Sequence, residues 1–391
     1  MALLEIKDLT VHFDTDDGLV RAVDGISYSV DRGQTLGIVG ESGSGKSVSS
    51  MTVMGLTRAP NARISGQILF DGTDLLEATD ADLRKVRGND IAMIFQDPLS
   101  SLHPFYKVGK QIAEAVRVHN DVTKAQAWDR AVEMLSLVGI PEPRKRADAY
   151  PHEFSGGMRQ RAMIAMALAN NPKLLIADEP TTALDVTVQA QILELIERLQ
   201  SEFDAAVVII THDLGVVAEV ADEIAVMYAG RIVEHASADT IFHAPEHPYT
   251  WGLLGSIPRL DTPRDEELVP ISGRPPSLIN LPGGCSFHPR CPYVREAHRH
   301  TEPVLEPVPD ASDHQVACLL DSGLRKRIWA ELAAGRNPFE ARVQTLGDAP
   351  PPETVEAVVG GVNLAEAMPD VGDPSEPAVA SGEQATEGEA R

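Results

Sequence analysis

The sequence has no apolar run long enough to cross a lipid bilayer. The longest uncharged apolar runs, such as residues 162–169, are far shorter than the roughly 20 residues that a membrane-spanning helix needs. Residues 1–5 also lack the pattern of a secretory signal peptide. We therefore expect a cytosolic chain, and for work at a membrane we expect other subunits to supply the membrane spans.

Positive charge is also scarce. The chain has 34 Lys and Arg against 58 Asp and Glu, which gives a formal net charge of −24 at pH 7. Proteins that bind nucleic acids in general usually carry a basic face, so this balance disfavours nucleic acid as a partner. Part of the negative charge lies after residue 344, where Pro, Gly, Ala and acidic residues predominate. Such a composition cannot bury enough apolar surface to order itself, which predicts a disordered acidic tail over residues 344–391.

Cysteine is rare, and its positions are uneven. The chain contains 3 cysteines, and all of them lie late in the sequence, at Cys285, Cys291 and Cys318. In a cytosolic chain, this clustering suggests a metal site more than disulfide bonds. Hydrophobic residues make up 43% of the 391 residues, which is typical of a globular protein. A chain of this length is large enough for more than one domain.

One stretch of eight residues carries a specific signal for phosphate binding. It matches the pattern G-x-x-x-x-G-K-[ST] at Gly40, Glu41, Ser42, Gly43, Ser44, Gly45, Lys46 and Ser47. A strand-like apolar run, residues 35–39, precedes the loop, and a predicted helix, residues 48–56, follows it. In such a loop the backbone N–H groups close around phosphate oxygens. Lys46 would then reach the β- and γ-phosphates, and Ser47 would bind Mg²⁺.

Three further strand ends carry candidate catalytic groups. Residues 173–177 form an apolar strand that ends in Asp178, a candidate Mg²⁺ ligand, and Glu179, a candidate general base. Gln96 follows the predicted strand 91–95, where its side chain would reach Mg²⁺ or a water near the γ-phosphate. His212 follows the predicted strand 206–210 and would contact the γ-phosphate. These positions predict one site at the carboxyl edge of a parallel sheet.

Two other features have either a functional role or an ordinary structural one. Ser155, Gly156 and Gly157 open a predicted helix, so they form either an anion-binding turn or an ordinary N-cap. Phe13 ends an early predicted strand, where it either stacks on an adenine ring or packs within the sheet. Between these features, apolar residues recur at helical spacing over residues 109–140, which predicts an α-rich insertion in an α/β core.

Together these motifs resemble the nucleotide-binding subunit of an ABC transporter over residues 1–255. The phosphate loop resembles its Walker A motif, Gln96 its Q-loop, residues 155–159 its signature and residues 174–179 its Walker B motif with the catalytic Glu. Asp185 ends a segment similar to the D-loop, and His212 resembles the switch histidine. The signature departs from the usual Leu-Ser-Gly-Gly-Gln at Phe154 and Met158. The resemblance implies a P-loop ATPase with a helical subdomain at about residues 100–170, which uses ATP and Mg²⁺.

The resemblance also implies partners and a site shared between two subunits. In this family two nucleotide-binding domains pair head to tail, and each ATP meets the Walker A loop of one subunit and the signature of the other. We therefore expect Ser155, Gly156, Gly157 and Asp185 to serve the ATP of a second nucleotide-binding subunit, which would be a paralogue. The region after Gln96 would contact two membrane-spanning permeases, which places the chain at the cytoplasmic face of the cell membrane. An extracytoplasmic substrate-binding protein would complete the importer.

A finer resemblance points to peptide importers. It lies in residues 20–25, 96–102 and 247–250, and in an extension like that of this subfamily at residues 256–335. Some members hold an iron–sulfur cluster on four cysteines of the extension, whereas this chain has His298 at the third position. Cys285, Cys291, His298 and Cys318 therefore suggest a [4Fe–4S] cluster, a structural zinc ion or no metal.

We thus expect an ATPase that powers import of di- and oligopeptides. Two alternatives are the same ATPase serving nickel or another small solute, and a soluble ABC ATPase of DNA repair or translation. Members of the latter class usually have two nucleotide domains in one chain or a long coiled coil, and the sequence has neither feature.

Overall fold

The computed structural model describes residues 2–97, 101–182, 184–257 and 271–347. Three predicted features lie wholly or partly outside these residues: Pro98 to Ser100 of the segment after Gln96, Ala183 of the D-loop, and the tail from residue 348 onward. In the described parts, no helix combines the length and the apolar composition that crossing a membrane requires.

The chain begins with a four-stranded antiparallel sheet. Its strand order is β2 (Gly18–Val30), β1 (Leu4–Thr15), β4 (Ala62–Phe70) and β5 (Thr73–Asp74). Buried and exposed side chains alternate along much of β1 and β2, as expected for a sheet with one covered face. A tight turn joins the first two strands, because Thr15 pairs directly with Gly18.

The second sheet holds the parallel strands. β3 (Thr35–Val39), β8 (Ala206–Thr211), β7 (Leu174–Asp178) and β6 (Ile91–Ile94) lie side by side and are buried along their length. Such continuous apolar runs are typical of parallel strands covered on both faces. Gly40, Gln96, Glu179 and His212 follow the ends of these strands, so they are placed at one edge of the sheet.

The other half of this sheet includes the C-terminal region. β9 (Glu223–Tyr228) pairs parallel with β3, and β10 (Arg231–Ser237) pairs antiparallel with β9. β12 (Ala311–Val316) then pairs with β10, and β11 (Glu306–Val308) with β12. The extension that begins near residue 256 therefore adds strands to the sheet of the nucleotide-binding core.

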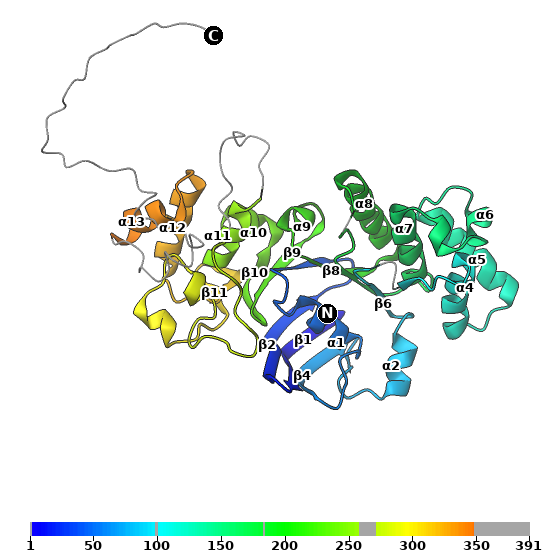
Figure 1. Cartoon of the computed structure of the whole chain (residues 1–391), viewed down its shortest axis with the longest axis horizontal. Coiled ribbons are helices and arrows are strands. Elements are labelled where there is room, and N and C mark those ends of the chain that lie inside the picture. The colour runs from blue at the N-terminus through cyan, green and yellow to red at the C-terminus, as the bar shows by residue number, and fades with distance from the viewer. Residues whose placement is uncertain (1, 98–100, 183, 258–270, 348–391) are drawn as a thin grey trace, which may run out of the picture.

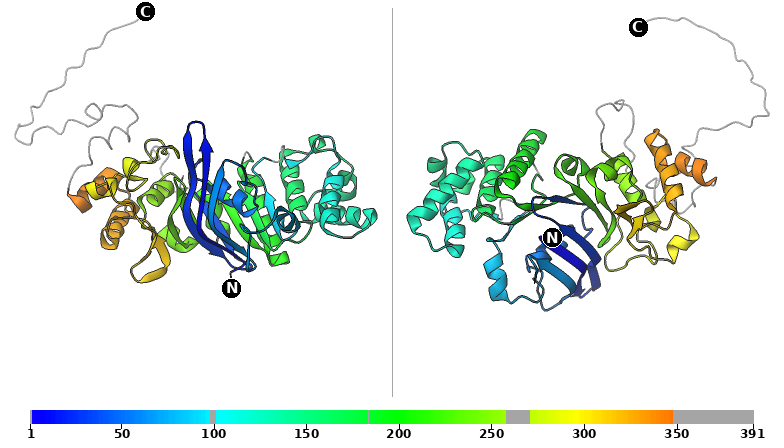
Figure 2. Two further views of the ribbon diagram at one scale, coloured as in Figure 1. Left: turned by 90° about the horizontal axis from the view of Figure 1, so that it is seen from below. Right: turned by 180° about the vertical axis from the view of Figure 1, so that it is seen from behind.

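The helices lie around these sheets, and Figures 1 and 2 show two helical groups at opposite ends of the molecule. One group is the predicted insertion, and the other is C-terminal. The helices are α1 (Lys46–Val53), α2 (Asp80–Val86), α4 (Val108–His119), α5 (Lys124–Leu137), α6 (Pro143–Ala147), α7 (Gly156–Ala167), α8 (Val186–Phe203), α9 (Leu214–Val220), α10 (Ala238–His243), α11 (Pro248–Gly255), α12 (Ser322–Ala333) and α13 (Pro338–Leu346). The predicted α/β core with a helical subdomain is confirmed.

Two boundaries differ from the expectations. α1 begins at Lys46, inside the phosphate loop, rather than at residue 48. α13 continues to Leu346, three residues into the segment assigned to the tail. A capping box between Asn337 and Glu340 starts α13, and Gly347 ends it in the left-handed conformation. These local caps order the chain up to that point in spite of its polar composition.

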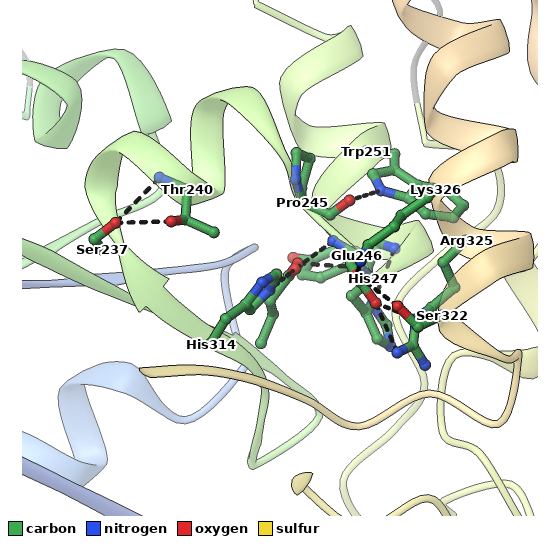
Figure 3. A network of polar contacts seen from close by, with 12 residues as sticks. Ser237, Thr240, Pro245, Glu246, His247, Trp251, His314, Ser322, Arg325 and Lys326 are labelled. Carbon is green, nitrogen blue, oxygen red and sulfur yellow. Dashed lines mark hydrogen bonds and ion pairs between the residues drawn. The ribbon is translucent and has the colours of Figure 1, made fainter. Parts of the chain in front are cut away.

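A buried polar network joins the C-terminal region to the core (Figure 3). Glu234 of β10 is fully buried and accepts a hydrogen bond from His314 Nε2 of β12 at 2.8 Å. It also accepts hydrogen bonds from the backbone N–H groups of Glu246 and His247. The Glu246 carboxylate in turn accepts from Arg325 Nε of α12 at 2.7 Å. Since buried charges are costly unless they are paired, these contacts seat the extension in one position.

Candidate functional site

The phosphate loop packs tightly between β3 and α1. Gly45 has φ +101°, and a Cβ atom at this position would lie 2.2 Å from the carbonyl oxygen of Ala22. A Cβ atom on Gly40 would lie 2.1 Å from the carbonyl oxygen of Met227. Both positions therefore require glycine, which lets the loop backbone lie directly against β2 and β9.

Lys46 places its ammonium group inside this loop. The residue is 5% exposed, and its Nζ donates to the carbonyl oxygens of Gly40 at 2.6 Å and Glu41 at 3.0 Å. Burial lowers the pKa of Lys46, whereas the nearby charges of Glu179, Asp178 and Glu41 act in the opposite direction. The carboxylates of the site are thus close enough to act on this ammonium group.

Ser47 and Asp178 meet at the base of the loop. Ser47 Oγ donates a hydrogen bond to Asp178 Oδ1 at 2.9 Å. Burial raises the pKa of Asp178, and the hydrogen bond from Ser47 opposes this shift. A hydroxyl and a carboxylate beside a phosphate-binding loop form the oxygen donor set that Mg²⁺ prefers. The two residues therefore fit the predicted metal.

Glu179 is the centre of a second cluster. Its Oε2 accepts hydrogen bonds from Gln96 Nε2 and from Thr182 Oγ1, each at 2.8 Å, and its Oε1 lies 3.3 Å from His212 Nδ1. Burial would raise the pKa of Glu179, but the hydrogen bonds from Thr182 and His212, with the charges of His212 and Lys46, hold it below its usual value. The carboxylate is therefore kept ionised, as a proton acceptor must be.

The backbone at Glu179 is itself unusual. Its φ is +47°, in the left-handed region that non-glycine residues rarely adopt. The backbone N–H of Glu179 donates to the carbonyl oxygen of Ile210 at 2.9 Å, which ties the residue to the end of the neighbouring strand β8. Backbone strain of this kind is concentrated at functional sites.

Thr182 is the site residue that the sequence analysis did not single out. It lies three residues after Glu179, in a turn that precedes α8, and its hydroxyl donates directly to the carboxylate. Its spacing could have suggested the contact, because a side chain three residues on returns to the same side of a tight turn.

The signature residues and Asp185 lie together in a different hollow. The described residues that line it include Ser155, Gly156, Gly157 and Asp185, and they come from α7, α8 and the turns before them. Ser155 Oγ accepts from the backbone N–H of Met158 at 3.3 Å. The residue is therefore an N-cap, which was the structural alternative to an anion-binding turn. Asp185 caps α8 in the same way. A Cβ atom on Gly156 would meet only open space, which leaves the start of α7 accessible.

Phe13 lies in the antiparallel sheet. It pairs with Val20 on one side and Ala62 on the other, and it packs, partly buried, against the apolar cluster beneath the sheet. Phe13 therefore packs within the sheet, and its stacking on an adenine ring stays a prediction.

The cysteine region does not assemble into the predicted ligand set. Cys285, Cys291 and Cys318 are free thiols whose pKa values are raised by burial, that of Cys318 to about 12. His298 accepts a hydrogen bond from the backbone N–H of Arg295 through Nδ1 at 2.7 Å. Within the described ranges, no group of three or more Cys, His, Asp or Glu side chains is arranged to hold a metal ion. The four residues therefore do not fit an iron–sulfur or zinc site.

Comparison with known proteins agrees with the geometry. The family described as "ABC transporter" matches residues 23–182, and the family described as "Oligopeptide/dipeptide transporter, C-terminal region" matches residues 233–297. The oligopeptide transport ATP-binding protein OppD of Bacillus subtilis (strain 168) is 56% identical over 309 residues, which are 79% of this chain and 86% of that protein.

A second relative and a solved structure extend the agreement. The dipeptide transport ATP-binding protein DppD of Escherichia coli (strain K12) is 50% identical over 325 residues, 83% of this chain and 99% of that protein. The dimeric post-hydrolysis structure of the ATP-binding cassette MJ0796, bound to ADP and Pi, superposes with a TM-score of 0.54 and 27% identity. The superposition covers 60% of this chain and 98% of the MJ0796 chain. The chain therefore belongs to the ATP-binding proteins of the ABC transporter family, in the branch that carries the oligopeptide/dipeptide transporter C-terminal region.

Proposed function

We propose that this chain binds and hydrolyses ATP to power the import of di- and oligopeptides through a multi-subunit transporter. The observation that carries the ATPase activity is the Glu179 carboxylate, which holds contacts from Gln96, Thr182 and His212. The peptide cargo is supported by the C-terminal region, which matches that of oligopeptide and dipeptide transporters, and by the relatives named for peptide transport.

The phosphate loop supplies the binding interactions. Its backbone N–H groups and the Lys46 ammonium would hold the β- and γ-phosphates of ATP. Ser47 and Asp178 would hold Mg²⁺, whose charge offsets that of the phosphates when it is bound. Phe13, two residues before the end of β1, is proposed to stack on the adenine ring.

Hydrolysis is assigned to the Glu179 cluster. The carboxylate would accept a proton from the attacking water as the water oxygen bonds to the γ-phosphorus and ADP leaves. Thr182 and Gln96 orient the carboxylate through the hydrogen bonds at 2.8 Å. His212 Nδ1 lies 3.3 Å from Glu179 Oε1. We infer that His212 would also contact the γ-phosphate and would report the loss of that phosphate.

The signature hollow is proposed to act in a pair of subunits. Ser155, Gly156, Gly157 and Asp185 line a surface of their own, with an accessible helix start. The MJ0796 cassette was solved as a dimer with ADP and Pi, and it has the same fold. We infer that this surface covers the ATP bound by a second nucleotide-binding subunit, a paralogue of this chain.

The remaining partners follow from the same assignment. We infer two membrane-spanning permeases and an extracytoplasmic substrate-binding protein, with this chain peripheral at the cytoplasmic face of the membrane. Phe105 and Tyr106, in the loop between β6 and α4, are exposed by 82% and 57% and offer an apolar surface to a permease. Residues 1–255 would form the ATPase domain, residues 256–335 the extension and residues 344–391 the acidic tail.

An iron–sulfur cluster does not enter the proposed function. The side chain of His298 is directed to the backbone of Arg295, and in the described ranges no three or more Cys, His, Asp or Glu side chains are grouped to hold a metal ion. The extension is instead seated on the core by the Glu234 network.

The test is capture of the complex in its ATP-bound state. A tagged Glu179→Gln chain is expressed with its native partners, solubilised with magnesium and ATP, and analysed by mass spectrometry. Lys46→Ala is the matched control, because it should bind nucleotide poorly. Recovery of two permeases and a second ATPase only with Glu179→Gln supports the proposal. Transport assays with radiolabelled peptides and with Ni²⁺ then decide the cargo, and recovery of ribosomal or DNA-repair proteins without permeases contradicts the importer.

A further inference from the structure

A salt bridge joins the C-terminal region directly to the phosphate loop. Arg290 belongs to the short helix η2 (His288–Arg290), and its side chain is 3% exposed. Its Nη1 donates to Glu41 Oε2 at 2.5 Å, and its Nη2 donates to Glu41 Oε1 at 3.0 Å. Glu41 is the second residue of the phosphate loop. Bidentate pairs between Arg and a carboxylate are strong and have a defined geometry, so this contact fixes a side chain of the loop.

Arg290 is held in one orientation by its other contacts. Nε donates to the carbonyl oxygen of Ser272 at 2.9 Å, and Nη2 donates to that of Ile271 at 3.2 Å. Nη1 also reaches the hydroxyl of Tyr228 at 3.5 Å. With the two bonds to Glu41, all five N–H donors of the guanidinium have an acceptor. The group is therefore a preorganised partner for Glu41.

The backbone of Glu41 shapes the first turn of the loop. Its N–H donates to Tyr249 Oη at 2.8 Å. Its carbonyl oxygen accepts from Lys46 Nζ at 3.0 Å and from the backbone N–H of Ser44 at 3.2 Å. A change in the position of Glu41 would therefore move the Lys46 ammonium and the loop amides, which are the groups that face phosphate.

Glu41 also places a negative charge in a loop that has to bind a polyanion. Its side chain is 29% exposed, so solvent screens it only in part. The Arg290 guanidinium neutralises this charge at hydrogen-bonding distance. Without Arg290, the carboxylate would repel phosphate oxygens and would be free to compete for the loop N–H groups.

We propose that Arg290 is a positioning residue for nucleotide binding, which acts by holding and neutralising Glu41 of the phosphate loop. This inference rests on the proposed function, because it requires that residues 40–47 bind ATP. It gives the C-terminal region a direct part in the ATP site of the same chain.

A second buried pair in the same region serves as the matched control. Arg325 of α12 donates to Glu246 and to the carbonyl oxygen of Leu320, and its side chain is 6% exposed (Figure 3). It seats the C-terminal region on the core, and among the described contacts it involves no residue of the phosphate loop. Arg325→Met therefore measures what loosening of the region does by itself.

The experiment titrates the full chain with magnesium AMP-PNP, a non-hydrolysable ATP analogue, by isothermal titration calorimetry. Arg290→Met should bind about tenfold more weakly than wild type, as expected for the loss of a charge-assisted bidentate contact. Arg325→Met should stay within about twofold of wild type, although it removes a comparable buried pair. Adding Glu41→Gln to Arg290→Met should restore most of the lost affinity, because the unpaired carboxylate is then gone.

Equal affinities of Arg290→Met and Arg325→Met overturn the inference, and so does failure of Glu41→Gln to rescue. If Arg290→Met does not fold, Arg290→Lys and Arg325→Lys make the same comparison. Lysine keeps the charge but cannot pair bidentately, so Arg290→Lys should bind about threefold more weakly than Arg325→Lys, and equal binding overturns the inference. A wild-type chain that does not bind AMP-PNP overturns the proposed function and this inference with it, which separates the two failures.

Discussion

Gln96 and Glu179 lie 83 residues apart in the chain, and a hydrogen bond of 2.8 Å from Gln96 Nε2 to Glu179 Oε2 joins them. Gln96 follows β6 and Glu179 follows β7, and these strands are parallel neighbours. The contact therefore connects the carboxylate assigned to catalysis with the segment that leads into the helical subdomain. A change in the position of that subdomain would move the donor of this hydrogen bond.

The first prediction concerns Glu179→Gln. We expect ATP turnover by the assembled complex to fall by about 100-fold or more, because the variant loses the proton acceptor. Nucleotide binding should be retained, since the phosphate loop is unchanged. The measurement is phosphate release at saturating ATP together with AMP-PNP affinity. Thr182→Val is the milder comparison, because it removes one hydrogen bond and leaves the carboxylate. Normal turnover by Glu179→Gln would exclude the general-base role.

The second prediction compares two glycines of the phosphate loop. Gly45→Ala should weaken AMP-PNP binding at least about tenfold, since its Cβ would lie 2.2 Å from the carbonyl oxygen of Ala22 and the backbone would have to move. Gly43→Ala should have a smaller effect, because a Cβ atom there meets nothing within 4 Å, although φ is also positive. Titration calorimetry on both variants makes the test, and the reverse order of affinities would contradict the packing argument.

The strand-end residues were the part of the site most open to prediction. Gln96, Asp178, Glu179 and His212 each follow a continuous apolar run, and parallel strands bring such ends to one edge. The structure places all four at that edge, beside the phosphate loop. The local sequence pattern was therefore enough to predict these four positions. An apolar run marks the strand, and the residue that follows it marks the strand's carboxyl end.

The contacts of the C-terminal region could not be predicted in the same way. The bond from Arg290 to Glu41 spans 249 residues, and no local pattern links the two positions. The pairing of β12 with β10 likewise depends on how the extension folds back onto the core. The resemblance to family members with four cysteines suggested a ligand set at Cys285, Cys291, His298 and Cys318. A resemblance in sequence does not determine where a side chain points, and His298 is directed to a backbone amide.

The third prediction concerns pH and His247, which caps α11. Burial lowers the pKa of His247 from 6.5 to about 3, and the charge of Arg325 adds to this effect. Its Nδ1 accepts from the backbone N–H of Tyr249 at 3.1 Å, and the ring also bonds to the backbone of Ala317. Protonation would break the contact with Tyr249. Because the folded pKa lies below the unfolded one, this stabilisation is complete above pH 6.5 and is lost as pH falls toward 3.

The expected loss of folding stability from His247 is about 1.4 kcal/mol per pH unit, or about 2 kcal/mol between pH 6.5 and pH 5. His247→Asn keeps a side-chain acceptor for the helix cap and removes the titrating ring. Between pH 6.5 and pH 5, the free energy of unfolding of wild type should therefore fall by about 2 kcal/mol more than that of His247→Asn. Urea unfolding at pH 6.5 and pH 5 measures the difference. His243→Asn, at an exposed position of α10, is the control and should follow wild type. Parallel pH profiles for His247→Asn and wild type would contradict the prediction.

The fourth prediction concerns the surface proposed to meet the permeases. Gln111 orders the loop before α4, because its side chain accepts from the backbone N–H of His103 and donates to the carbonyl oxygens of His103 and Tyr106. The loop thereby presents Phe105 and Tyr106 to solvent. Exposed aromatic side chains on an ordered loop are suited to anchor a protein partner. The double variant Phe105→Ala and Tyr106→Ala should lower recovery of the permeases with a tagged chain by about tenfold.

Nucleotide binding by the same double variant should equal that of wild type, because neither side chain contacts the phosphate loop in the described structure. Val118→Ala is the matched control, since Val118 is also an exposed apolar residue of the helical subdomain, on α4 itself. It should recover permeases as wild type does, if the loop and not general apolar exposure carries the contact. Undiminished permease recovery with the double variant would show that the permeases dock elsewhere, and a matching loss with Val118→Ala would extend the docking surface onto α4.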